Sequence, residues 1–107
     1  MAPSSDPVIL EFLKHIAPLR DRLDKVILFG SRARGDDRPF SDYDVLIVVP
    51  QKDRALKSTL YDAAVDTLLA TGREISLKII PRAAFDHQAG LPTPFMKNVL
   101  QEGVPLG

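Results

Sequence analysis

Two acidic residues, Asp42 and Asp44, flank a tyrosine at the start of the apolar segment DYDVLIVVP. Successive side chains of a β-strand point to opposite faces, so both carboxylates would project to the same side. Two close carboxylates repel each other unless a cation lies between them, and Mg²⁺ prefers oxygen ligands. The pair therefore predicts a magnesium site suited to phosphoryl displacement. The structural alternative is a turn or strand-entry cap at Ser41 and Asp42, with Asp44 facing solvent.

A glycine and a serine, Gly30 and Ser31, follow a second apolar segment, KVILF, and open the loop that leads to the two aspartates. Glycine lets a phosphate approach the backbone closely, and the hydroxyl and amides that follow can donate to phosphate oxygens. Arg32 and Arg34 add positive charge. We expect these four residues to bind a nucleotide, although a tight turn is the structural alternative. The segment is not a P-loop, because no Gly-Lys-Ser or Gly-Lys-Thr follows.

Three apolar segments should form the strands that position these residues. The short, β-branched runs at 25–30 and 45–49 predict buried strands. The segment EISLKII, at 74–80, alternates between apolar and polar residues and predicts a third strand. Shorter helices are expected toward the end of the chain, at 83–87 and 95–103.

Two longer helical segments are also expected. Asp6 followed by Pro7 is typical of a helix start, and Pro18 should break or kink that helix. A second helix is predicted over 54–71, ending at Gly72. Its apolar face would consist of Leu56, Leu60, Ala64 and Leu68.

Composition limits the classes of function. A chain of 107 residues with 45% hydrophobic content fits one domain, 1–107, with a single core. Basic and acidic residues number 14 each, so no overall basic field exists to attract nucleic acid or an anionic membrane. The absence of cysteine fits a reducing cytoplasm, and no signal-like segment or long apolar run occurs. We therefore expect a cytoplasmic protein that binds neither membranes nor nucleic acid directly.

The segments LFGSRARG and SDYDVLIVV together resemble the signature of the DNA polymerase beta-like nucleotidyltransferase superfamily, where Gly-Ser precedes Asp-x-Asp by some ten residues. Here ten residues, 32–41, separate Ser31 from Asp42, and the flanking sequence resembles the minimal nucleotidyltransferase branch. The resemblance is closest over 26–49 and weaker at the third strand and at LQEGVPL. It implies an α/β fold with a small mixed sheet flanked by helices. It also implies Mg²⁺ and transfer of a nucleotide, AMP from ATP, with release of pyrophosphate.

The same resemblance assigns roles to the acidic residues. It implies that Asp42 and Asp44 hold the metal and that a third carboxylate stands on a later strand. Glu74 is the candidate, although an aspartate is commoner there, and it would bind the metal or take a proton from the acceptor hydroxyl. Two alternatives stay open. Glu74 could be a solvated charge paired with Lys78, or Ser76 could occupy the family position, in which case the third acid is missing.

A partner protein is the last implication of the resemblance. Minimal nucleotidyltransferases commonly act as antitoxins beside a HEPN-type toxin, a ribonuclease, which they neutralise by binding or by attaching adenylate to a tyrosine. The chain ends too soon for the second domain that larger members use to bind an acceptor, so we expect such a toxin or self-association to complete the site. Two other functions remain open: a non-catalytic module that neutralises a toxin, and a small-molecule nucleotidyltransferase of the aminoglycoside kind.

Overall fold

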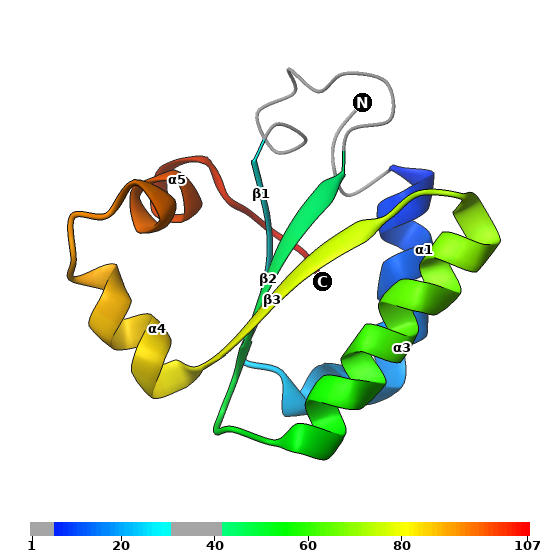
Figure 1. The fold of residues 1–107 in the computed structure, drawn as a ribbon, viewed down its shortest axis with the longest axis horizontal. Coiled ribbons are helices and arrows are strands. Elements are labelled where there is room, and N and C mark those ends of the chain that lie inside the picture. The colour runs from blue at the N-terminus through cyan, green and yellow to red at the C-terminus, as the bar shows by residue number, and fades with distance from the viewer. Residues whose placement is uncertain (1–5, 31–41) are drawn as a thin grey trace.

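The structure, a computed structural model, describes residues 6–30 and 42–107 of the chain (Figure 1). In this part of the chain, a four-stranded mixed sheet is covered by helices on both faces. The predicted α/β fold with a small mixed sheet is therefore confirmed. No helix in the described ranges is long and apolar enough to cross a lipid bilayer.

The sheet contains β1 (Lys25–Phe29), β2 (Tyr43–Val49), β3 (Ile75–Pro81) and β4 (Val104–Pro105), in the order β3-β2-β1-β4. Strand β1 is antiparallel to both β2 and β4, whereas β2 and β3 are parallel. The three predicted strands are confirmed, and the short β4 was not predicted. The order places β2 inside the sheet and β3 at one edge.

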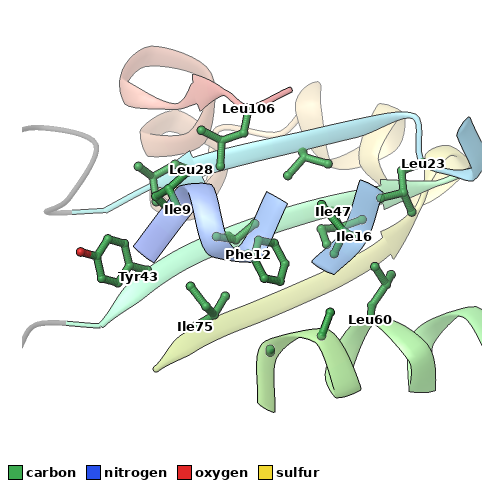
Figure 2. Close-up of a cluster of buried hydrophobic side chains, with 14 of the residues drawn as sticks. Ile9, Phe12, Ile16, Leu23, Leu28, Tyr43, Ile47, Leu60, Ile75 and Leu106 are labelled. Atoms are coloured by element: carbon green, nitrogen blue, oxygen red, sulfur yellow. The ribbon is translucent and has the colours of Figure 1, made fainter. Parts of the chain in front are cut away.

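Helices α1 (Pro7–Ile16) and α3 (Arg54–Thr71) cover one face of the sheet, on the right in Figure 1. Figure 2 shows how their side chains meet those of the strands in the larger of two cores. Fully buried members of this core are Ile9, Phe12, Ile16, Val45, Ile47 and Leu60. This core fixes the strand that carries the two aspartates.

Helices α4 (Arg82–Ala89) and α5 (Pro94–Glu102) lie on the other face. They enclose a smaller core of Leu46, Val48, Phe85, Met96 and Val99. Alternate residues of β2 enter the two cores, which explains why the strand reads as a continuous apolar run.

The helix ends follow the signals in the sequence. The Asp6 carboxylate accepts a backbone hydrogen bond of 2.8 Å from the first turn of α1. That helix ends at Ile16, and the 3-10 helix η2 (Ala17–Arg22), which contains Pro18, follows it directly. Asp53 caps α3 in the same way, with a hydrogen bond of 3.0 Å. Gly72 ends α3 in the left-handed conformation, with φ of 73°. The helix starts at Pro7 and Arg54, the break at Pro18 and the stop at Gly72 were predicted, whereas the Asp53 cap and η2 were not.

The predicted buried face of α3 is wrong at one position, Leu68. Leu56, Leu60 and Ala64 are buried, but Leu68 is 41% exposed. Each step of four residues turns about 40° past a full rotation of the helix, so three steps carry Leu68 about 120° away from Leu56. Thr67 is fully buried in its place, and its hydroxyl donates to a carbonyl of the preceding turn. The outer flank of α3 is therefore more apolar than expected.

Candidate active site

Asp42 and Asp44 lie where β2 begins. Between them, the Tyr43 ring enters the larger core, where it is 3% exposed and its hydroxyl donates to the Asp6 carboxylate at 2.9 Å (Figure 2). Because alternate residues of a strand face opposite sides, Asp44 points toward the face that α4 and α5 cover. Asp44 is half-buried and Asp42 is exposed. Tyr43 therefore belongs to the core, whereas the two aspartates on either side of it do not.

The surroundings of Asp44 disfavour its negative charge. Burial raises the pKa of the Asp44 carboxyl above its ordinary value, and the nearby negative charge of Asp42 raises this pKa further. A bound cation would relieve both effects, because it stabilises the ionised form. Two carboxylates are also the oxygen ligands that Mg²⁺ prefers. Asp42 and Asp44 therefore fit a divalent cation and are the residues that would hold it.

Gly30 lies directly against the Asp44 carboxylate. Its φ is +78°, a left-handed conformation that favours glycine. A Cβ atom added to Gly30 would lie 2.5 Å from Oδ2 of Asp44, so the Asp44 side chain would have to move to accommodate it. The antiparallel pairing of β1 with β2 causes this proximity, because Phe29 is the partner of Asp44. The start of the predicted nucleotide-binding segment thus adjoins the predicted metal ligands, while Ser31, Arg32 and Arg34 lie outside the described residues.

Glu74 immediately precedes β3, and its side chain is exposed. Its carbonyl accepts a hydrogen bond of 3.2 Å from the Tyr43 amide, and the β3 residue directly alongside Asp44 is Ser76. Within the described ranges, no three His, Asp or Glu side chains are grouped so that they could hold a metal ion together. The structure thus brings Asp42 and Asp44 together without adding a third acid. The role of Glu74 as that acid stays a prediction.

An aromatic pair and a lysine lie on the same face of the sheet as Asp44. The rings of Phe29 and Phe95 meet edge to face with centroids 5.4 Å apart, and the Lys78 amino group lies 5.4 Å from the Phe95 centroid. The alternation of β3 in the sequence could have placed Lys78 on this face. No local signal could have joined Phe29 to Phe95, because the contact depends on how α5 packs against β1.

Comparison with known sequences places the chain in a family. The family described as "Nucleotidyltransferase domain" matches residues 8–105. "Putative protein adenylyltransferase MJ0604" of Methanocaldococcus jannaschii is 33% identical over 101 residues, which are 94% of this chain and 95% of that protein. "Putative protein adenylyltransferase MJ0141" of the same organism is 58% identical over 45 residues, which are 41% of this chain and 46% of that protein. The second match thus spans less than half of that relative.

Solved structures share the fold. A toxin-antitoxin crystal structure with AMP-PNP has a TM-score of 0.58 at 16% identity and covers 91% of this chain and 70% of that one. A crystal structure described as "a putative nucleotidyltransferase from Sulfolobus solfataricus" has a TM-score of 0.51 at 20% identity and covers 92% of this chain and 75% of that one. Such low identities support the fold alone. The family match, the relative aligned over nearly its whole length and the shared fold agree that this chain belongs to the nucleotidyltransferase domain family and is a nucleotidyltransferase.

Proposed function

We propose that this chain transfers AMP from ATP to a hydroxyl group of a partner protein, with Mg²⁺ held by Asp42 and Asp44. The observation that carries the proposal is the contact between Gly30 and the Asp44 carboxylate, with the charge of Asp42 nearby. A triphosphate at the glycine would lie beside the metal ligands. The names of the two archaeal relatives support adenylate as the transferred group and a protein as the acceptor.

The residues of the site would share the work of binding and positioning. Magnesium, when bound, would neutralise negative charge on the phosphate oxygens. The absence of a side chain at Gly30 gives a phosphate room to approach the backbone. Ser31, Arg32 and Arg34 would donate hydrogen bonds to the phosphate oxygens, and the positive charges of the two arginines would favour the anionic substrate. Positioning and charge neutralisation would supply most of the acceleration, because phosphoryl transfer asks little covalent chemistry of the protein.

The transfer requires a base for the acceptor. The acceptor oxygen would form a bond to the α-phosphorus while the bond from that phosphorus to the bridging oxygen breaks, which releases pyrophosphate. The acceptor loses its proton in this step, and we assign that proton to the Glu74 carboxylate. Glu74 is exposed at the start of β3, so a hydroxyl on a docked protein could reach it.

We assign the acceptor to a tyrosine of a HEPN-type toxin, which would make this chain an antitoxin. The resemblance to minimal nucleotidyltransferases supports this partner, as do the toxin-antitoxin complexes among the structures that share the fold. The use of ATP and the absence of cysteine favour the cytoplasm. A non-catalytic toxin-binding module is the second candidate, because the residue alongside Asp44 on β3 is Ser76 and not an acid.

Intact-mass measurements can separate the two candidates. The chain would be incubated with the product of its neighbouring gene, ATP and Mg²⁺. We expect the partner to gain one or more adenylate units with the wild type and none with Asp42→Asn. Asp21→Asn is a matched control, because Asp21 is exposed on η2, before β1, whereas the site lies after that strand. A stable complex with unmodified masses would contradict adenylate transfer and favour the binding module.

A further inference from the structure

The outer edge of β3 offers backbone groups to another strand. Strand β3 lies at one edge of the sheet, and among the described residues it pairs with β2. The Tyr43 amide donates to the Glu74 carbonyl, and parallel pairing then turns the backbone groups of alternate residues away from β2. The N–H and C=O groups of Ile75, Leu77 and Ile79 therefore face the edge, where a further strand can bind them.

A hollow of about 310 Å³ lies beside this edge, between β3 and α3. From α3 it is lined by Tyr61, Ala64, Val65 and Leu68, and from the β3 side by residues 74–77. Three of these helix residues are large and strongly exposed: Tyr61 at 43%, Val65 at 52% and Leu68 at 41%. An open strand edge and an uncovered apolar flank therefore adjoin each other, which is typical of a protein interface.

We propose that a second copy of the chain binds this edge, with the two β3 strands antiparallel and Ser76 opposite Ser76 on a two-fold axis. The segment Glu74-Ile75-Ser76-Leu77-Lys78 is self-complementary when it runs antiparallel to itself. Glu74 then lies opposite Lys78 of the second copy, and the symmetry produces this pair twice. Isologous interfaces of this kind are the commonest in soluble oligomers.

Hydrogen bonding and charge select the same register. Ile75 would lie opposite Leu77, and because both turn their backbone groups outward, they would exchange two hydrogen bonds. The Glu74–Lys78 pairs would fall at the positions between, where antiparallel side chains come closest. A shift of two residues removes both charge pairs. A shift of four places Lys78 opposite Lys78 or Glu74 opposite Glu74, and like charges directly opposite each other are unfavourable.

The apolar side of the edge fits a second copy as well. Leu77 points toward the face that α3 covers and is only partly buried, so Leu77 of the second copy would lie at the hollow beside Tyr61 and Val65. The symmetry would then bring the exposed flanks of the two α3 helices together. Lys78 must turn away from Phe95 to reach Glu74, which its four-carbon side chain allows.

The proposed dimer goes beyond the nucleotidyltransferase activity and does not depend on it. It leaves Asp42 and Asp44 to the metal, because neither belongs to β3. The Glu74 carboxylate has two oxygens, so a bond from Lys78 of the second copy leaves one for the acceptor.

Charge reversal tests the register directly. We expect the wild type to sediment as a dimer, and Glu74→Lys or Lys78→Glu alone to dissociate at least tenfold more readily, because each places like charges opposite each other. An equimolar mixture of the two variants should regain the dimer, since the lysines of one chain then face the glutamates of the other. Lys52→Glu reverses an exposed charge before α3 and should leave association unchanged.

Analytical ultracentrifugation and native mass spectrometry would measure these states, with circular dichroism to establish that each variant is folded. A wild type that stays monomeric at millimolar concentration would overturn the proposal. So would single variants that dimerise as tightly as the wild type, or a mixture that remains monomeric.

Discussion

The environment of Asp44 disfavours the negative charge of its carboxylate. Burial and Asp42 raise the pKa of its carboxyl in the folded chain. Ionisation of Asp44 therefore lowers the free energy of unfolding. This loss is absent below the unfolded pKa of about 3.9 and complete once the pH exceeds the raised folded value.

The neutral isostere should remove that loss. We predict that Asp44→Asn unfolds at a higher temperature than the wild type at pH 7 without metal, and that the difference disappears as the pH falls below about 4. Thermal unfolding followed by circular dichroism across this pH range would measure it. Equal stability at pH 7, or an advantage that grows toward acid, would contradict the assigned environment.

Gly30 and Gly72 have the same backbone conformation but different surroundings. Both have left-handed backbones, with φ of 78° and 73°, but an added Cβ would meet Asp44 at Gly30 and nothing within 4 Å at Gly72. We predict that Gly72→Ala lowers the free energy of unfolding by roughly 1–2 kcal/mol through backbone strain alone. Gly30→Ala should lower it further and also weaken nucleotide binding. Urea unfolding and nucleotide titration would measure both; equal losses without a binding defect would separate Gly30 from the site.

Glu74 and Ser76 compete for the role of the third site residue. If Glu74 accepts the proton of the acceptor, Glu74→Gln should leave the fold intact and lower adenylate transfer by roughly 10² or more. Ser76→Ala should then have little effect on the rate. Transfer kinetics with both variants would decide, and the reverse pattern would reassign the role to Ser76.

Among the elements, α3 has one side that is buried against the sheet and one side that is exposed. Leu60 is fully buried against the sheet, whereas Leu69 is 78% exposed on the same helix. Leu60→Ala should destabilise the fold by about 2–5 kcal/mol through the lost contacts and the cavity, and Leu69→Ala by less than about 0.5 kcal/mol. Chemical denaturation of both variants would test the packing, and similar losses would contradict the orientation of α3.

The elements also show what the sequence could predict. Local signals were sufficient for the cap at Asp6, the start of α3 at Arg54, the stop at Gly72 and the apolar strands, because each depends on neighbouring residues. The position of Leu68 was missed because an even spacing of four residues ignores the drift of a helix. The register that sets Ser76 beside Asp44 could not be predicted, since strand pairing depends on how both cores pack.

At the scale of the whole molecule, the candidate site lies at the beginning of β2, the most buried of the described strands. Strand β2 lies inside the sheet, enters both cores and carries Asp44 at its beginning, so the acid rests on a firmly packed element. The sequence predicted the acid pair and the glycine from their types and spacing. Their contact depends on the antiparallel pairing of β1 with β2 across a long connection, which no local pattern specifies.

Magnesium-dependent nucleotide binding at Asp42 and Asp44 can be measured by calorimetric titration with a non-hydrolysable ATP analogue. The wild type should bind the analogue well only when Mg²⁺ is present, because two carboxylates fill part of a six-coordinate shell and phosphate oxygens must complete it. Asp42→Asn should weaken this binding at least tenfold, whereas Asp21→Asn should match the wild type. Equal affinity of the wild type and Asp42→Asn in the presence of Mg²⁺ would contradict the assignment of the site.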